Sequence, residues 1–181
     1  MSTKIWTLDL AHSEVHFKIK HLVISTITGS FTIFSGSLKT VTVDHNDFAN
    51  AAFDMLIDVY SIDTNNLDRD KHLKSPDFFN ADLYPQMKFH STSFKHIHGD
   101  EYKLTGPLTI KGITREVTFD VLFGGQAKDG FGINRAGFEI TGTINRNDFD
   151  IHAPDVTEVG GLVLGEEIKL LANIQFIYDI D

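Results

Sequence analysis

The sequence contains no cysteine, and that absence removes several kinds of site at once. Without a thiol the chain can form no disulfide, offers no thiolate nucleophile and supplies no sulfur ligand to a metal. Tryptophan occurs once, and no segment approaches the roughly 20 consecutive apolar residues that a membrane-spanning helix needs. We therefore expect no stable membrane insertion, so any lipid must come to the protein.

Basic residues are also few. The chain has 16 Lys and Arg against 25 Asp and Glu, a formal net charge of -9 at pH 7. Such a field repels nucleic-acid backbones, so we expect no nucleic-acid partner. With 41% hydrophobic and 23% charged residues, the composition is that of a globular protein, and a length of 181 residues predicts a single domain over residues 1–181.

The first ten residues bear on the compartment. They carry one lysine and lead directly into an alternating pattern, without an apolar stretch of signal-peptide length. As given, the sequence predicts a cytoplasmic protein, or a periplasmic one if a leader was removed.

Alternation with a period of two dominates the sequence. In the clearest example, Val15, Phe17 and Ile19 share one face of a strand, and polar residues occupy the other. About eight strands are predicted in this way, over residues 15–20, 31–43, 51–60, 87–94, 102–110, 117–123, 138–144 and 168–178. Short connections favour antiparallel pairing, and closure removes exposed edges. The predicted fold class is all-β, an eight-stranded antiparallel barrel.

The alternation stops over residues 61–79. There the run NNLDRDKHLKSPDFF predicts a short helix, capped near Asp63 or Thr64 and ended by Pro76. This helical insertion, near residues 63–80, would suit a plug or lid at one barrel end. Its apolar residues are Leu67, Leu73, Phe78 and Phe79.

Within this insertion, Arg69, Asp70 and His72 could suggest acid and base groups. Residues at this spacing on a helix do not all share a face, and no nucleophile at a sharp turn accompanies them. We expect Arg69 and Asp70 to tie the insertion to the barrel rim through buried hydrogen bonds.

Two further motifs have a structural explanation. His96 and His98 would share a strand face and could hold zinc or copper, but no third ligand is placed beside them. A solvated strand end explains this pair, and we expect no metal site. A group of glycines joins two strands instead of opening a helix, which predicts a hairpin loop rather than a phosphate site. These glycines are Gly124, Gly125, Gly130 and Gly132.

Five motifs occur in order along the chain. They are W-x-L-D from Trp6 with His12, Ser13, Val15, Phe17 and His21; S-I-D-T-N and R-D-K-H-L-K-S-P-D-F-F within 61–79; Y-P-x-M-K-F at 84–89; G-P-L-T-I-K-G-I-T-R-E-V at 106–117; and I-N-R-N-D-F at 144–149. With these motifs the sequence resembles the YceI-like family of lipocalin-like polyisoprenoid-binding proteins. The resemblance implies an elongated, lipocalin-like barrel with one helical insertion, enclosing an isoprenoid chain or similar amphiphile, often in a dimer. It brings no catalytic residue.

One position departs from the family pattern. Family members usually have Gly after the Phe of N-R-x-D-F, whereas this chain has Asp150. Glycine permits backbone conformations that Asp adopts less easily, so the departure bears on the local turn and on any headgroup contact there.

Phenylalanine is abundant, with 15 residues, and many lie on the faces assigned inward. Periodicity alone leaves two interiors open, one filled by packed rings and one holding a slender ligand, because apolar cores and apolar pockets share one pattern. The family resemblance favours the ligand. The predicted ligand-binding residues are Phe17, Ile19, His21, Phe31, Phe53, Phe79, Phe89, Phe119, Phe138, Arg135, Asn145 and Arg146.

Four of these residues are candidates for contact with a headgroup: His21, Arg135, Asn145 and Arg146. For Arg146 the alternative is a structural ion pair with Asp148 or another carboxylate. For His21 the alternative is a satisfied core histidine, although a neutral imidazole could also bond an ester, quinone or phosphate oxygen.

The predicted function is that of a binding protein and not an enzyme. It would bind, store or transport a long apolar amphiphile, such as a polyisoprenoid, an isoprenoid quinone or a fatty-acid derivative. We expect this lipid as the ligand, no cofactor, and a homodimer. Two alternatives stay open: a metal-assisted enzyme acting on a bound lipid, and a stress-response interaction module with a filled core.

Overall fold

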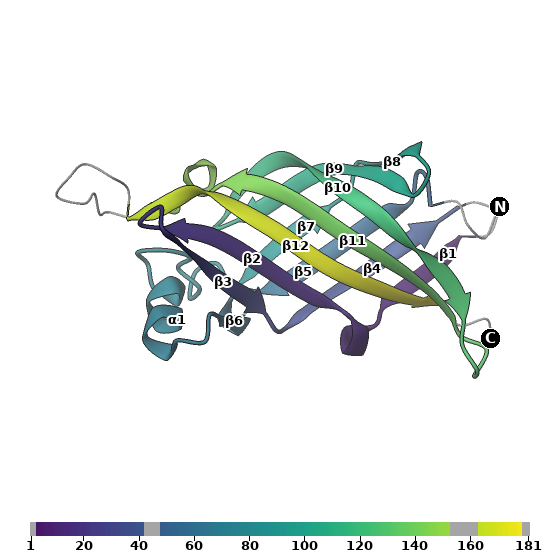
Figure 1. Ribbon diagram of the computed structural model, residues 1–181, viewed down its shortest axis with the longest axis horizontal. Coiled ribbons are helices and arrows are strands. Elements are labelled where there is room, and N and C mark those ends of the chain that lie inside the picture. Colours follow the sequence, from purple (N-terminus) through teal and green to yellow (C-terminus); the bar gives the residue numbers. More distant parts are fainter. Residues whose placement is uncertain (1–2, 42–47, 153–162, 179–181) are drawn as a thin grey trace.

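Alternating strands close into an elongated barrel, with the described ends of the chain, in the first and last strands, at one end and a short helix at the other (Figure 1). The computed structural model describes residues 3–41, 48–152 and 163–178. Among these residues, eight antiparallel strands form a ring in the order β1-β4-β5-β7-β9-β10-β11-β12, which closes where β12 pairs with β1. The predicted fold class is confirmed. The ring strands are β1 (Lys4–Leu8), β4 (Phe34–Thr40), β5 (Ala52–Asp58), β7 (Gln86–His90), β9 (Glu101–Ile110), β10 (Ile113–Lys128), β11 (Asn134–Asn145) and β12 (Leu164–Tyr178).

Four further strands of the described residues extend this ring. β12 pairs with β1 near its carboxyl end and with β2 nearer its amino end, so β1 and β2 follow one another along one edge of β12. β2 pairs with β3, β3 pairs with β6, and β8 pairs with β9. The bounds are Glu14–His21 for β2, Ser25–Phe31 for β3, Ile62–Asp63 for β6 and Ser93–His98 for β8. Three single turns of 3-10 helix lie between strands: η1 (Leu10–His12), η2 (Val59–Ser61) and η3 (Arg146–Phe149).

The alternation misplaces some strand boundaries. It does not predict β3, whose sequence STITGSF has few apolar residues. Gly29 in β3 is required by packing, because a Cβ there would lie 2.3 Å from Cζ of Phe17. The single strand predicted over residues 31–43 is divided between the end of β3 and β4, and residues 87–94 span β7 and the start of β8.

The helix α1 (Leu67–Lys74) begins later than the sequence predicts. Its cap is Asn66, whose side-chain oxygen accepts a hydrogen bond from the Arg69 backbone N–H at 3.0 Å. The Asp63 side chain instead accepts from the Asn65 N–H, and Asn65 adopts a left-handed φ of 58°. A residue in that conformation cannot belong to a right-handed helix, so α1 starts only after it.

The glycine-rich segment is a hairpin, as predicted, but two of its glycines lie inside a strand. β10 shifts register between Phe123 and Gly125, and Gly125 has a φ of 114°. Such a bulge needs a backbone that tolerates positive φ, which glycine supplies. Only Gly130 and Gly132 belong to the turn between β10 and β11.

Aromatic rings fill the half of the barrel that carries the chain termini. Phe48 enters from the segment between β4 and β5, and only 1% of its surface is exposed. Its ring centroid lies 5.6 Å from Trp6, 5.2 Å from Phe123 and 5.1 Å from Phe138. We call this part of the interior the filled half. Its rings belong to Trp6, Phe48, Phe94, Phe123, Phe138, Phe176 and Tyr178.

Candidate functional site

The other half of the interior, at the end that carries α1, is hollow. It contains a cavity of about 410 Å³, a volume within the usual range for small-molecule pockets. The ring of Phe53 lies 6.0 Å from Phe89 in the cavity wall and 5.8 Å from Phe176 in the filled half, so it marks the boundary between the halves. Nine of the predicted ligand-binding residues line this cavity: Phe17, Ile19, His21, Phe31, Phe53, Phe79, Phe89, Phe119 and Arg146.

Two glycines make room for cavity rings against the barrel wall. A Cβ at Gly142 in β11 would lie 2.4 Å from Cδ1 of Phe119. In the same way, a Cβ at Gly29 would lie 2.3 Å from Cζ of Phe17. Each ring therefore occupies the space above a glycine, and a side chain at that glycine would displace it. These small residues keep Phe119 and Phe17 close to the wall.

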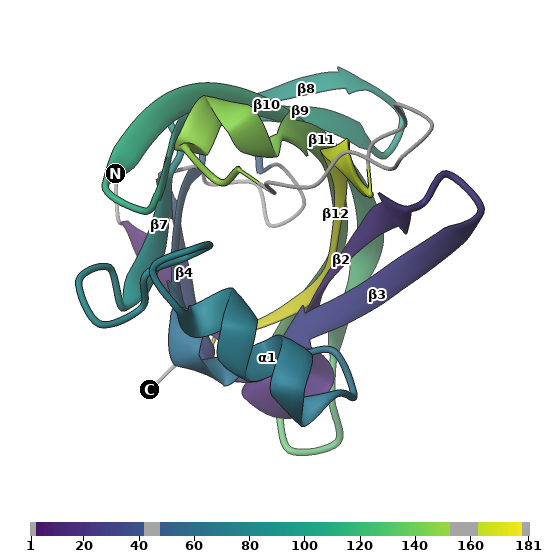
Figure 2. The same ribbon diagram turned by 90° about the vertical axis from the view of Figure 1, so that its left-hand side faces the viewer.

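The α1 segment forms part of the wall at this end of the barrel (Figure 2). Leu73 and Phe79 line the cavity, and the Phe79 ring packs edge-on against Phe31 with a centroid distance of 6.3 Å. Leu67 is different, because 88% of its surface is exposed. Although Leu67 is one of the apolar residues of the insertion, it takes no part in the cavity wall, since α1 turns it toward solvent.

Thr64, which follows β6, holds α1 in place. The buried carboxylate of Asp70 accepts hydrogen bonds from the Thr64 backbone N–H, at 2.9 Å, and from its hydroxyl. Arg69 donates from Nε to the Thr64 hydroxyl at 2.7 Å and from Nη2 to the Thr64 carbonyl at 2.8 Å. Arg69 and Asp70 thus make structural hydrogen bonds, but their partner is Thr64, within the insertion itself, and not a ring strand at the rim. His72 instead pairs with Asp77 on the exposed side of the segment.

Arg146 brings a buried positive charge to the cavity. It is the first residue of η3, and only 3% of its surface is exposed. Nε donates to the Gly165 carbonyl at 2.8 Å, Nη1 to the Ile151 carbonyl at 2.7 Å, and Nη2 to the Leu164 carbonyl at 3.3 Å. Burial lowers the pKa of this guanidinium, and the charge of exposed Glu166 acts in the opposite direction.

The alternative interpretation of Arg146, an ion pair with Asp148 or another carboxylate, is wrong for the part of the chain that the structure describes. No carboxylate in that part lies within 4 Å of its guanidinium, which bonds to neutral oxygen atoms. The backbone of η3 and the start of β12 supply most of these oxygens, because they fold around the side chain.

His21, in the last position of β2, is half-buried at the cavity wall. The sequence left open that His21 is a core histidine whose hydrogen bonds are satisfied. The structure does not support this alternative, because the ring has no hydrogen-bond partner among the described residues. His21 pairs in register with Leu164, the residue whose carbonyl accepts from Arg146. Two polar side chains thus approach the cavity beside the same residue of β12.

Three predicted ligand-binding residues lie away from the cavity. Phe138 belongs to the filled half, and Asn145 accepts a hydrogen bond from the Asn147 N–H as the cap of η3. Arg135 forms ion pairs with Asp9 at 2.6 Å and Asp129 at 2.8 Å. At about 3.3 Å per strand residue, Arg135 lies roughly 35 Å from Arg146 along β11. The alternation gives the face of a residue but not its height in the barrel, which is why these placements fail.

Apart from Ile19, the aliphatic and Met lining residues are absent from the predicted site, which emphasised phenylalanine. They lie at inward positions, and the same alternation that identifies Phe53 and Phe89 could have found those on the predicted strands. Examples are Ile27, Met55, Met87, Leu108 and Leu170.

Asp150 occupies the position where the family usually has glycine. It has a φ of 55° and a ψ of 34°, the left-handed conformation that closes η3. Its carbonyl accepts a hydrogen bond from Nζ of Lys111 at 2.7 Å, and its carboxylate lies 2.9 Å from Nε2 of His152. The turn is formed, and it delivers the carbonyl of Ile151 to Arg146.

The pair His96 and His98 is engaged in exposed contacts. Nε2 of His96 lies 2.7 Å from the Gly99 carbonyl, and Nε2 of His98 lies 3.3 Å from a carboxylate oxygen of Glu101. Over the three described ranges, no group of three or more His, Asp or Glu is arranged to hold a metal ion. The helices of those ranges are also too short or too polar to cross a membrane.

Comparison with known proteins agrees with this architecture. The sequence profile of the YceI-like domain matches residues 6–176. The chain belongs to the YceI-like family. It is 41% identical over 172 residues to a UPF0312 protein of Staphylococcus aureus (strain N315), a match that covers 94% of this chain and 96% of that protein. The predicted family is confirmed.

Solved structures share the YceI-like fold. The crystal structure of BcnA from Burkholderia cenocepacia has a TM-score of 0.79 at 26% identity, covering 93% of this chain and 98% of BcnA. The YCEI protein of Campylobacter jejuni has a TM-score of 0.74 at 32% identity, covering 91% of each chain. A polyisoprenoid binding domain from Saccharophagus degradans has a TM-score of 0.70 at 13% identity, covering 96% of this chain and 98% of that domain, and this likeness is one of fold.

Proposed function

We propose that this protein binds the chain of an apolar amphiphile in the cavity at the α1 end, as a carrier or reservoir rather than as an enzyme. The observation that carries the proposal is the hollow half itself. A cavity of about 410 Å³ lined by Phe, Leu, Ile and Met lies beside a half of the same barrel that is packed with rings. Burial of hydrocarbon in such a space is favourable by roughly 25 cal/mol per Å².

The cavity volume limits the length of chain that it can enclose. An apolar cavity of about 150 Å³ holds one benzene molecule, so 410 Å³ corresponds to two or three groups of that size. An isoprenoid or acyl segment of about 15 carbons is comparable. A longer ligand would have to project from the barrel or displace the rings of the filled half.

An isoprenoid chain is the first candidate for the ligand, as a polyisoprenoid or an isoprenoid quinone. The domain from Saccharophagus degradans that shares this fold is described as polyisoprenoid binding. A fatty-acid derivative offers the same slender shape to the same apolar wall and is the second candidate.

Extraction of the purified protein with organic solvent, followed by mass spectrometry, tests the proposal. We expect a stoichiometric lipid, and we expect the delipidated protein to take up a fluorescent fatty acid. Leu170→Asp, which places a carboxylate on the cavity wall, should abolish uptake, whereas Lys169→Asp on the exposed side of the same strand should not. Absence of both lipid and uptake in the folded wild-type protein would overturn the proposal.

A further inference from the structure

The ionisable side chains on the cavity wall all have the same sign. The protein has a formal net charge of -9, yet no Asp or Glu of the described residues lines the cavity. The ionisable residues that do line it are His16, His21, Arg69, His72, Lys88 and Arg146. His16 and Lys88 alternate with the inward-facing Phe17 and Phe89, so their side chains lie on the outward face of the wall. The interior of this acidic protein therefore meets basic groups at Arg69, Arg146 and His21 and no acidic group of the described residues, which points to the charge of the ligand.

Most of these basic groups have carboxylates nearby or lie in solvent. His16 pairs with Glu14 and His72 with Asp77, and Lys88 is exposed. Arg69 shares the hydroxyl of Thr64 with the carboxylate of Asp70. These groups therefore contribute to the field without requiring a ligand.

Arg146 forms no ion pair within 4 Å among the described residues, and exposed Glu166 acts on it only from farther away. Its guanidinium is buried and bonds to the carbonyls of Gly165, Leu164 and Ile151 and, at 3.4 Å, to Oδ1 of Asn147. A guanidinium has five N–H donors, so these four contacts leave one N–H without an acceptor in the described part of the chain. A buried charge is costly unless an opposite charge accompanies it. Its lowered pKa reflects the same burial.

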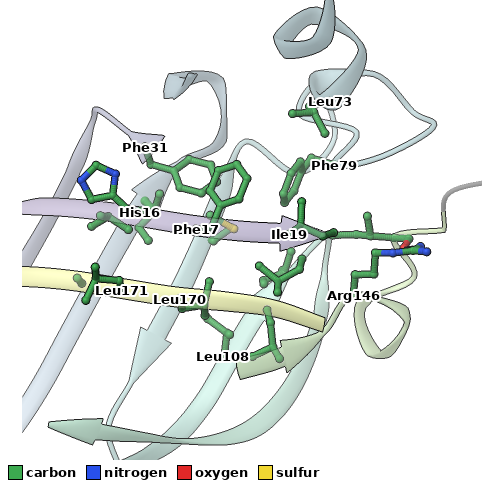
Figure 3. Close-up of a pocket in the computed structure, with 18 of the residues that line it drawn as sticks. His16, Phe17, Ile19, Phe31, Leu73, Phe79, Leu108, Arg146, Leu170 and Leu171 are labelled. Atoms are coloured by element: carbon green, nitrogen blue, oxygen red, sulfur yellow. The ribbon is translucent and has the colours of Figure 1, made fainter. Parts of the chain in front are cut away.

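The position of Arg146 suits a headgroup. Figure 3 shows it at one end of the lining residues, with apolar side chains such as Phe17 and Leu170 extending away along β2 and β12. His21 is paired in register with Leu164, whose carbonyl accepts from Arg146, so its ring approaches the same place. Within the described part of the chain that ring has no hydrogen-bond partner. An amphiphile could therefore place its polar end against Arg146 and His21 while its chain follows the wall past Phe17 and Leu170.

We propose that the ligand is an anionic amphiphile whose oxyanion headgroup, a carboxylate or a phosphate, binds at Arg146 and His21. The proposal rests on the proposed function, because it specifies the polar end of the molecule whose chain fills the cavity. A guanidinium binds both oxyanions through charge-assisted hydrogen bonds. A neutral amphiphile of equal length would leave the charge of Arg146 buried without an opposite charge.

Calorimetric titration of the delipidated full-length protein with matched probes tests this inference. The probes are palmitate against palmitamide, and farnesyl phosphate against farnesol, all below their micelle concentrations. We expect at least one anion to bind about tenfold or more tightly than its neutral partner at pH 7. The pair that shows the larger difference identifies a fatty acid or a prenyl phosphate as the source of the oxyanion.

Variants assign the difference to the site. Arg146→Gln should bring the anion to the affinity of the neutral probe, whereas Arg115→Gln, which removes an exposed charge outside the cavity, should preserve the preference. Should Arg146→Gln fail to fold, His21→Ala supplies the test, because the His21 ring makes no bond within the described residues. We expect His21→Ala to lower the affinity for the anionic probe by about fivefold and to leave the affinity for the neutral probe unchanged.

Each result bears on one of the two proposals. Equal binding of the anionic and neutral probes would overturn the headgroup site and leave the proposed function standing. Preference for the anion in a folded Arg146→Gln protein would place the site elsewhere and also overturn it. Failure of every probe to bind the wild-type protein would overturn the proposed function itself.

Discussion

The two halves of this barrel use the same strands and the same alternation, yet one half is filled and the other hollow. At the terminal end, Phe48 enters from outside the strands and its ring lies against Trp6, Phe123 and Phe138. At the α1 end, glycines occupy the inward positions beneath Phe17 and Phe119, and a cavity remains.

This difference follows from the size of a small barrel. An interior of about eight strands is just wide enough to be filled by its own side chains or to hold one slender ligand. One additional ring from a connecting segment is therefore enough to fill the barrel interior at its level. A glycine in place of a larger inward residue leaves space there instead. At the α1 end, β3 also pairs with β6 instead of a ring strand, and Leu73 and Phe79 complete the wall.

The largest effect is expected from Phe119→Asp. The Phe119 ring is buried against Gly142, and its replacement removes that packing and buries an unpaired carboxylate. We expect a loss of about 5 kcal/mol in the free energy of unfolding, measured by urea denaturation. Thr118→Asp, on the exposed side of the same strand, should change stability by less than about 1 kcal/mol. Equal losses in the two variants would contradict the assignment of Phe119 to the buried face and Thr118 to the exposed face.

Phe48→Ala should convert part of the filled half into cavity. Removal of this ring should cost about 3–4 kcal/mol of unfolding free energy and raise the relative affinity for longer chains. A series of fatty acids of increasing length, competing against one fluorescent probe, measures the second effect. Phe131→Ala is the control, because Phe131 is 93% exposed. An unchanged length preference in a folded Phe48→Ala protein would show that the ring of Phe48 does not limit the length of chain that the barrel accepts.

Gly142→Ala should make the hollow half smaller. The new methyl group would meet the Phe119 ring and push it toward the cavity, which should lower amphiphile affinity and destabilise the protein by about 1–3 kcal/mol. Gly137→Ala is a matched control in the same strand, since no heavy atom lies within 4 Å of the position of its Cβ. We expect the control to change stability by less than about 0.5 kcal/mol. Similar behaviour of the two variants would mean that Phe119 can move without loss.

The terminal end should also be the more acid-sensitive one. Burial of Asp9 acts to raise its pKa, but hydrogen bonds to His12 and Gln175 outweigh burial, so the pKa lies below its ordinary value. A carboxyl whose pKa is lower in the folded state stabilises the protein at neutral pH, and that stability is lost as the pH falls through the folded pKa. The melting temperature of Asp9→Asn should therefore fall less between pH 7 and pH 3 than that of the wild type.

Glu116→Gln, which changes an exposed carboxyl on β10, is the control for this comparison. Its melting temperature should follow the wild-type curve with pH. If the melting temperatures of Asp9→Asn and the wild type fell equally with pH, Asp9 would not contribute to the acid sensitivity of the protein.

The smallest effect is expected at Asp150. Glycine adopts the left-handed conformation of this residue without strain, so Asp150→Gly should stabilise the protein by about 0.5 kcal/mol, less the contribution of the carboxylate contacts with His152 and with Lys111. Alanine has neither the backbone freedom of glycine nor the carboxylate of Asp150. Asp150→Ala should therefore have a lower melting temperature than both the wild type and Asp150→Gly. A glycine variant less stable than the wild type would show that the carboxylate contacts exceed the backbone strain.

The predictions made from the sequence succeeded where the relevant physics is local. Which side chains of a strand point inward depends on the pleat alone, so Phe17, Phe89 and Phe119 were assigned correctly to the interior. The start of α1 was placed too early, because the turn at Asn65 competes with the helix for the preceding residues.

The sequence by itself therefore determined the family, the antiparallel barrel and the inward faces. Only the tertiary structure decided which inward residues meet a cavity, because height in the barrel depends on the register between strands distant in sequence. That register separates Phe138 from Phe119 and places Arg146, without a carboxylate partner in the described residues, beside the carbonyl of Leu164. The position of Phe48 depends on packing rather than on period, since it lies outside any strand.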